Sequence, residues 1–253
     1  MVRLEIRNLS KIFVSEKGEQ IEALSNINLT IDEQEFICIV GPSGCGKTTF
    51  LRIIGGLDVA TSGTIQLNGQ VITGPTPQMA MIFQEYSLFP WRTVIDNVAF
   101  GLELRGLPKE ERYQIAKKYL DLVGLTGFAE NFSYELSGGM RQRVAVARAL
   151  AIEPKVILMD EPFGALDAQT RNRMQNELLQ IWEKAKKTII FVTHSVDEAV
   201  FLGDRVIALT KRPAKIKEIV PVIHCRPRDR TCSEFVSIRK HVLELIAEES
   251  SGT

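Results

Sequence analysis

The sequence predicts an α/β fold with a parallel β-sheet. Continuous apolar runs at residues 36–40, 79–83, 156–159 and 189–192 are short, which is typical of strands buried on both faces. Helical patterns separate several of these runs, and such alternation favours a parallel sheet. The chain of 253 residues is long enough for one large domain or for a domain with a subdomain.

The composition excludes several classes of protein. Hydrophobic residues make up 45% and charged residues 25%, which excludes wholesale disorder. Lys plus Arg and Asp plus Glu both number 31, and a chain without net charge is not expected to bind nucleic acid mainly through phosphates. No apolar run approaches the roughly 18 residues of a spanning helix, and residues 1–10 lack the apolar core of a signal peptide, so we expect a cytosolic location.

The N-terminal part has the pattern of half-buried strands. Apolar and polar residues alternate from Ile27 to Ile31. Two further apolar segments, 65–67 and 70–72, flank Asn68 and Gly69, a pair that favours a type I′ hairpin turn. We therefore expect an antiparallel β-region before the helical part of the chain.

Residues 86–151 have a helical pattern and are expected to form an inserted subdomain. Pro108 suits the first position of a helix, and Ser137 can cap a helix with an apolar stripe formed by Met140, Val144, Ala147 and Leu150. Further helices are expected at 169–187 and 235–247. We expect a single domain over residues 1–253, made of a core (1–85 and 152–220), the helical subdomain (86–151) and a short C-terminal extension (221–253).

Two remaining features have ordinary interpretations. The basic stretch 211–230 is expected to be a solvated surface. The four cysteines are too few for a disulfide scaffold and are expected to be reduced thiols: Cys38, Cys45, Cys225 and Cys232. A zinc site is the alternative, but its candidate ligands match no common zinc spacing: His224, Cys225, Cys232 and His241.

A phosphate-binding loop is the strongest chemical feature. Eight residues fit G-x-x-x-x-G-K-[ST] at every position: Gly41, Pro42, Ser43, Gly44, Cys45, Gly46, Lys47 and Thr48. The glycines let backbone N–H groups converge on phosphate oxygens, and the following helix presents its positive end. We expect Lys47 to reach the β- and γ-phosphates, Thr48 to bind Mg²⁺ and Thr49 to donate to the α-phosphate. A chance glycine-rich turn is a remote alternative, because a buried strand precedes the loop and a helix-compatible segment follows it.

Two carboxylates end the apolar run 156–159. Successive side chains of a strand point to opposite sides, so Asp160 can face Mg²⁺ while Glu161 faces an attacking water as general base. Alternatively, Glu161 only orients water or holds a partner loop. Gln84 and His194 also follow apolar runs. We expect Gln84 to touch Mg²⁺ and the water, with a plain turn residue as the alternative. We expect His194 to contact the γ-phosphate, with a structural or surface-exposed histidine as the alternative.

Ser137, Gly138 and Gly139 indicate a second anion site. Ser137 begins a helix whose first N–H groups are available to an anion. One ATP gains little from two distant helix N-termini of the same chain. We therefore expect two chains to pair head to tail in a two-fold dimer, in which each Ser137 helix covers the ATP of the other chain.

These motifs together resemble the nucleotide-binding subunit of ABC transporters over residues 3–220. The matching residues are the Walker A loop 41–48, the Q-loop residue Gln84, the signature 136–140, Walker B 156–160 followed by Glu161, the D-loop 164–167 and the switch residue His194. The resemblance implies a P-loop NTPase (RecA-like) core with a parallel sheet, an antiparallel β-subdomain and an inserted α-helical subdomain. It also implies ATP and Mg²⁺ as ligands, and an aromatic residue, here Phe13, that stacks on adenine.

Four segments resemble the nitrate, sulfonate and taurine importer group more specifically: 83–85, 88–91, 136–143 and 160–167. This resemblance implies ATP hydrolysis by a homodimer with ATP at its interface, bound to two membrane permease subunits on the cytoplasmic face and served by an extracytoplasmic substrate-binding protein. Tyr86 and Trp91 are expected to border the permease, while Leu88 and Phe89 pack internally.

The chain departs from the usual family residues at Gln34, Met140, Gly164 and Ser195, and none of these changes removes a catalytic group. Two other functions compete with transport. A soluble ABC ATPase of DNA repair or translation usually carries a long coiled-coil insertion or a second cassette, and this chain has neither. A P-loop kinase leaves the segment 136–143 and His194 unexplained.

Overall fold

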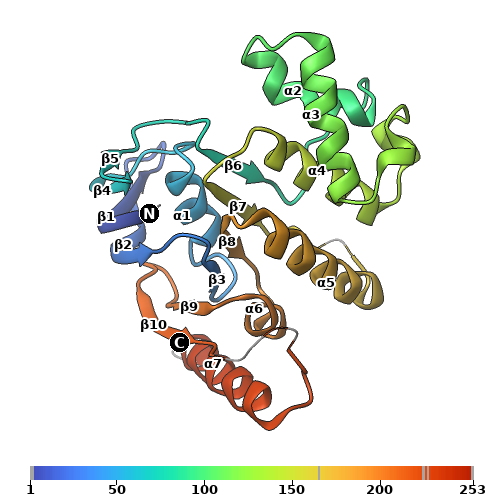
Figure 1. The fold of residues 1–253 in the computed structure, drawn as a ribbon. Coiled ribbons are helices and arrows are strands. Elements are labelled where there is room, and N and C mark those ends of the chain that lie inside the picture. The colour runs from blue at the N-terminus through green and yellow to red at the C-terminus, as the bar shows by residue number, and fades with distance from the viewer. Residues whose placement is uncertain (1–2, 165, 224–225, 227, 252–253) are drawn as a thin grey trace. The chain divides into compact units, whose positions relative to one another are not determined.

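The computed structural model describes residues 3–164, 166–223, 226 and 228–251, and Figure 1 shows its ribbon. Internal contacts divide the chain into two compact units, Met1–Thr76 with Thr188–Thr253 (unit 1) and Pro77–Lys187 (unit 2). The subdomain boundaries at residues 85 and 152 stay a prediction. Among the residues described, none of the helices is long and apolar enough to cross a membrane.

Unit 1 contains the expected antiparallel β-region as a four-stranded sheet in the order β2-β1-β4-β5. Its strands are β1 (Leu4–Val14), β2 (Gln20–Ile31), β4 (Ser62–Leu67) and β5 (Gln70–Val71). Asn68 and Gly69 have φ angles of 54° and 77°, and two positive values are what a type I′ turn requires. The hairpin predicted from the Asn-Gly pair is therefore confirmed.

A second sheet of unit 1 contains the parallel strands that the apolar runs predict. β3 (Phe36–Val40) pairs in parallel with β8 (Thr188–Val192) and with β9 (Arg205–Leu209), and β10 (Ile216–Pro221) pairs antiparallel to β9. Every residue of β3 and β8 is buried, which explains why neither strand alternates in polarity. α1 (Lys47–Ile54) contacts β8, α6 (Val196–Leu202) contacts β3, and α7 (Ser233–Ser251) contacts β9 and β10.

Unit 2 pairs β6 (Met79–Ile82) in parallel with β7 (Val156–Asp160). Three of its helices pack on one another: α2 (Val94–Leu104), α3 (Lys109–Leu122) and α4 (Gly138–Ala151). Two short 3₁₀ helices, η1 (Thr126–Phe128) and η2 (Ser133–Glu135), and α5 (Ala168–Ala185) complete it. Ser137 caps α4 as predicted, whereas Pro108 is the N-cap residue of α3 and not its first helical residue as expected.

The interpretation of 211–230 as a solvated surface is wrong for Arg226 and Arg228. The buried Arg228 guanidinium donates to the carbonyl oxygens of Val200, Phe201, Gly203 and Val222 at 2.6 to 3.0 Å. Arg226 forms an ion pair with Asp204 at 2.6 Å. The physical reason is that the last carbonyl groups of a helix have no intrahelical partner, and here arginines that follow β10 supply the donors at the end of α6.

The cysteine predictions are tested in part. Cys38 and Cys45 are buried free thiols, and burial raises the pKa of both, which makes them poor nucleophiles. Cys232 is also a free thiol. His224 and Cys225, two candidate zinc ligands, lie outside the described residues. Within the described part of the chain, no group of three or more His, Cys, Asp or Glu side chains gathers as a metal site.

Candidate functional site

The predicted phosphate-binding loop joins β3 to α1 in unit 1, and its glycines have a steric cause. Gly44 and Gly46 have φ angles of 72° and 123°, a region that L side chains rarely adopt. A Cβ atom on Gly46 would also lie 3.0 Å from Leu24 Cδ2 and 3.1 Å from the Ala23 carbonyl oxygen. Backbone conformation and close packing therefore both require glycine at position 46.

The ammonium group of Lys47 is buried within this loop. Lys47 is only 6% exposed, and its Nζ donates to the carbonyl oxygens of Gly41 at 2.8 Å and Pro42 at 3.0 Å. An isolated buried ammonium would be costly, but the two carbonyl groups solvate this one. The loop thus holds a positive charge in a fixed position.

The start of α1 adds to this positive charge. Gly46 is the N-cap residue and provides no side-chain cap, and the first backbone bond of the helix runs from Phe50 N to Gly46 O at 2.9 Å. The first-turn N–H groups therefore have no capping side chain, and the helix dipole makes this end attractive to an anion. Thr48 and Thr49, both predicted phosphate or metal contacts, lie in this first turn, where Thr48 is exposed.

His194 lies at the same edge of the sheet as the loop. It follows β8, and Thr193 N donates to Ile39 O at 3.1 Å, which aligns the ends of β8 and β3. The His194 side chain is exposed. Phe13, the expected adenine contact, is 40% exposed on β1, with the Lys11 ammonium 4.7 Å from its ring centroid.

The sequence did not single out Arg212, which contacts the loop from the segment between β9 and β10. Its Nη2 donates to the Gly44 carbonyl oxygen at 2.7 Å. No local pattern predicts this contact. It follows from the pairing of β9 with β3, which brings the ends of the two strands to one edge of the sheet.

In unit 2, Gln84 and Glu161 lie close to the same glycine. A Cβ atom on Gly164 would be 3.5 Å from Gln84 Nε2 and 3.9 Å from Glu161 Oε2. Asp160, at the end of β7, is 8% exposed, whereas the next residue, Glu161, is half-buried. The two carboxylates therefore differ in exposure. β7 ends at Asp160, so the prediction that Glu161 points to the opposite side as the next residue of the strand stays a prediction.

Glu161 also has an unusual backbone conformation that the sequence did not predict. Its φ angle is 43°, in the left-handed region that few residues other than glycine occupy. Gly164 N donates to Glu161 O at 3.0 Å and closes a turn around it. Such outliers cluster at functional sites. The expected D-loop lies within the described residues except for Ala165.

Ser137 is the N-cap residue of α4, as predicted. Its Oγ accepts a bond of 3.3 Å from Met140 N, and the side chain is exposed. Gly139 is buried, and a Cβ atom there would lie 3.2 Å from Met174 Sδ, so α5 packs closely against this turn.

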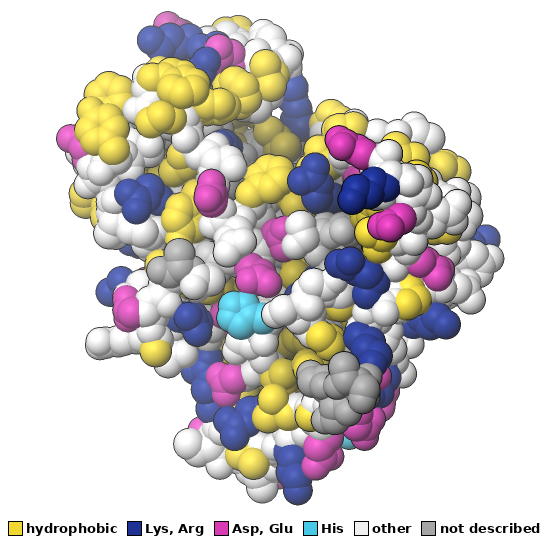
Figure 2. Space-filling view, turned by 180° about the vertical axis from the view of Figure 1, so that it is seen from behind, with side chains coloured by type: hydrophobic (Ala, Val, Ile, Leu, Met, Phe, Trp, Pro, Cys, Tyr) yellow, Lys and Arg dark blue, Asp and Glu magenta, His cyan; other side chains and the backbone are white. Residues whose placement is uncertain are grey.

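Large apolar side chains are exposed on unit 2, and Figure 2 shows yellow side chains gathered at the top of the view. The large apolar side chains of unit 2 that are 41 to 73% exposed are Trp91, Leu104, Phe128 and Tyr134. Phe89 packs on Phe100 with ring centroids 4.6 Å apart, which confirms its expected internal packing. Trp91, at 72% exposure, is available to another chain.

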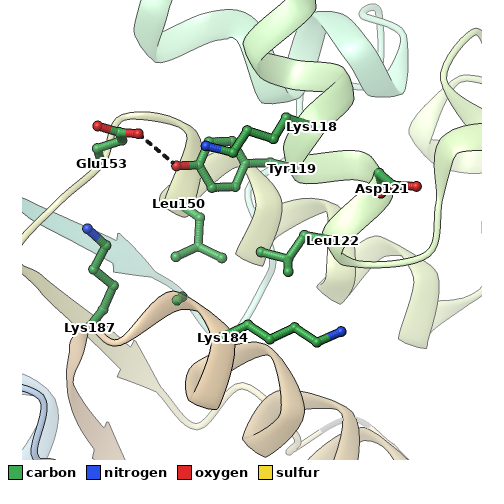
Figure 3. Close-up of a pocket in the computed structure, with 9 residues that line it drawn as sticks. Lys118, Tyr119, Asp121, Leu122, Leu150, Glu153, Lys184 and Lys187 are labelled. Carbon is green, nitrogen blue, oxygen red and sulfur yellow. Dashed lines mark hydrogen bonds between the residues drawn. The ribbon is translucent and has the colours of Figure 1, made fainter.

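Unit 2 also contains a cavity of about 440 Å³ that none of the predicted site residues lines. Figure 3 shows Lys118, Lys184 and Lys187 around it, with Tyr119 bonded to Glu153. The C-terminal ends of α3, α4 and α5 contribute to its wall. Helix C-termini carry partial negative charge, which favours lysines at this position.

Comparison with known proteins identifies the family. The ABC transporter family profile matches residues 24–164. An uncharacterized ABC transporter ATP-binding protein of Methanocaldococcus jannaschii is 58% identical over 98% of this chain and 92% of its own length. The nitrate import ATP-binding protein of Synechocystis is 54% identical over 85% of this chain and 81% of its own.

A solved structure supports the same assignment. It is the dimeric post-hydrolysis state of an ATP-binding cassette bound to ADP and Pi. It is 34% identical, with a TM-score of 0.75 over 88% of this chain and 100% of that chain. The P-loop NTPase fold expected from the sequence is therefore confirmed, and the chain belongs to the ABC transporter family as one of its ATP-binding subunits.

Proposed function

We propose that this chain hydrolyses ATP and thereby energises solute import through a membrane permease. The buried Lys47 ammonium, held by two loop carbonyl groups at the uncapped start of α1, carries the proposal. A fixed positive charge beside a helix N-terminus suits the phosphate chain of a nucleotide. In this assignment Gly41 to Gly46 wrap the phosphates, Thr49 contacts the α-phosphate and Phe13 stacks on adenine.

Glu161 is assigned as the general base that takes a proton from the attacking water. Gln84 orients that water, and His194 contacts the γ-phosphate. The closeness of the Gln84 amide and the Glu161 carboxylate to Gly164 supports their acting on one water molecule. These roles come from the order of the motifs along the chain.

The residues assigned to Mg²⁺ fit that ion. Thr48, Gln84 and Asp160 would hold it through oxygen atoms, the donors that Mg²⁺ prefers. Mg²⁺ usually keeps several waters and substrate phosphate oxygens as its other ligands, so a small number of protein ligands is enough. When bound, Mg²⁺ neutralises charge on the β- and γ-phosphate oxygens.

The proposed working form is a homodimer with ATP at its interface. Ser137, Gly138 and Gly139 of one copy bind the ATP held by the loop of the other. The exposure of Ser137 at the start of α4 and the dimeric state of the similar solved cassette support this arrangement.

Two permease subunits would dock at Trp91 and Tyr86, on the cytoplasmic face of the membrane, and an extracytoplasmic substrate-binding protein would supply the solute. The exposure of Trp91 supports the docking site. Relatives named for the import of nitrate, taurine and aliphatic sulfonates favour a small anion of this class as the solute.

The activity is tested by phosphate release from ATP with Mg²⁺. Lys47→Ala should lose ATP binding and turnover, whereas Lys17→Ala, which removes an exposed charge of the same unit, should retain both. Equal turnover of Lys47→Ala and the unaltered chain would contradict the proposal. Transfer of phosphate to an acceptor other than water would favour a kinase.

The solute is tested by co-purification. The permease and binding protein should be isolated with this chain from native membranes, and nitrate, taurine and alkanesulfonates titrated into the binding protein. Binding of none of them would remove the proposed solute class, and a chain without membrane partners would favour the soluble alternative.

A further inference from the structure

The contact of Arg212 with the phosphate-binding loop fixes the orientation of one peptide group. In a trans peptide, the carbonyl of Gly44 and the N–H of Cys45 point in opposite directions. The Gly44 carbonyl accepts from Arg212 Nη2 at 2.7 Å, while Cys45 N donates to Pro42 O at 3.3 Å. The Cys45 N–H therefore faces the same carbonyl that Lys47 Nζ contacts at 3.0 Å.

A glycine precedes this peptide bond, so its orientation depends on the two hydrogen bonds that hold it, one from within the loop and one from Arg212. Gly44 has a φ angle of 72°, and without a side chain it occupies positive and negative φ with similar ease. Rotation of the 44–45 peptide would turn the Cys45 N–H away from Lys47 and replace a donor with a carbonyl oxygen. An anion at Lys47 would then meet a repulsive group.

The segment that carries Arg212 is itself held by the last turn of α7. Lys211 N donates to Glu249 Oε2 at 3.0 Å, and Lys217 Nζ lies 2.9 Å from Glu249 Oε1. One carboxylate near the C-terminus thus contacts both sides of the β9–β10 hairpin. Glu249, Lys211 and Arg212 form a continuous path from α7 to the Gly44 carbonyl.

We propose that Arg212 is a positioning residue for nucleotide phosphates, and that the last turn of α7 controls ATP affinity through the β9–β10 hairpin. The inference rests on the proposed ATP binding by this loop. This proposal gives the C-terminal extension (221–253) a function. A partner or a modification that displaces Glu249 would weaken ATP binding without contacting the nucleotide.

The first test measures the Kd of the full chain for ATP with Mg²⁺ by calorimetry, with adenosine as a probe that lacks phosphates. Arg212→Ala should raise the Kd for ATP about tenfold, the equivalent of about 1.4 kcal/mol for one charged hydrogen bond. The Kd for adenosine and the kcat at saturating ATP should not change, because Arg212 contacts no reacting atom. Arg212→Lys, which keeps one donor, should have a smaller effect.

Lys215→Ala is the matched control, since it removes an exposed cation of the same hairpin. An equal loss of affinity in Lys215→Ala and Arg212→Ala would show a general charge effect and overturn the proposal. Unaltered ATP affinity in Arg212→Ala would overturn it too. Failure of the unaltered chain to bind ATP would overturn the proposed function together with this inference.

The second test examines the path from α7. Glu249→Ala should raise the Kd about two- to fivefold, the range for one ion pair near the protein surface, whereas Glu244→Ala on the same helix should not. In an Arg212→Ala background, Glu249→Ala should have no further effect, because both act on one peptide group. Full additivity of the two changes, or no effect of Glu249→Ala alone, would overturn the role of α7.

Discussion

Replacement of Arg228 by Met should destabilise unit 1 strongly. Met retains most of the apolar stem but removes the guanidinium that donates to the carbonyl oxygens of Val200, Phe201, Gly203 and Val222. Nη1 contacts three of these oxygens with two N–H groups, so the four contacts amount to about three full hydrogen bonds, or about 3 kcal/mol at about 1 kcal/mol each. Part of this loss is offset because burial of the charged group is itself unfavourable, which lowers the pKa of Arg228 to about 10. We expect the free energy of unfolding to fall by about 2 to 3 kcal/mol.

The assay is urea denaturation followed by circular dichroism, with Arg239→Met as the matched control. Arg239 lies on α7, is 42% exposed and pairs loosely with Asp197 at 3.6 Å, so its replacement should cost less than about 0.5 kcal/mol. Arg228→Lys should have an intermediate effect, because one ammonium group cannot reach all four carbonyl oxygens. A loss below about 1 kcal/mol in Arg228→Met would refute the conclusion that this arginine ties the end of α6 to β10.

Three further predictions concern the site and the pH dependence of stability. Glu161→Gln should bind ATP but hydrolyse it about 10²–10⁴ times more slowly, the cost of losing a positioned base; near-normal phosphate release would remove Glu161 from that role. Ser137→Arg should spare ATP binding by the isolated chain but prevent ATP-dependent dimer formation in gel filtration, and loss of monomer binding would contradict the cross-chain assignment. Burial and the nearby Glu153 raise the pKa of Tyr119 to about 12. The unfolded chain loses the Tyr119 proton near pH 10. The contribution of Tyr119 to the free energy of unfolding is therefore complete below pH 10 and is lost as the pH rises to 12. Tyr119→Phe should therefore reduce the fall in unfolding free energy between pH 10 and 11.5, and an unchanged slope would contradict this.

Features that depend on a few adjacent residues could be predicted from the sequence. The Asn68-Gly69 turn and the Ser137 cap each follow from local backbone chemistry, and both are present. β3 and β8 were predictable because strands buried on both faces read as unbroken apolar runs. Two glycines of the phosphate-binding loop, Gly44 and Gly46, likewise have positive φ angles.

Features that depend on contacts between residues far apart in the sequence could not be predicted. Arg228 looks like a surface residue in the sequence, and only the meeting of β10 with the end of α6 supplies its four acceptors. Arg212 contacts Gly44 across 168 residues of sequence. The left-handed conformation of Glu161 has no signal in the residue type, and it occurs at the start of a turn closed by Gly164.

A crystal structure of Glu161→Gln with ATP and Mg²⁺ tests the central claim most directly. We expect two copies of the chain, with each nucleotide bound by residues 41–49 of one copy and by Ser137, Gly138 and Gly139 of the other. A single copy that encloses its nucleotide completely, with the start of α4 turned away, would contradict the account.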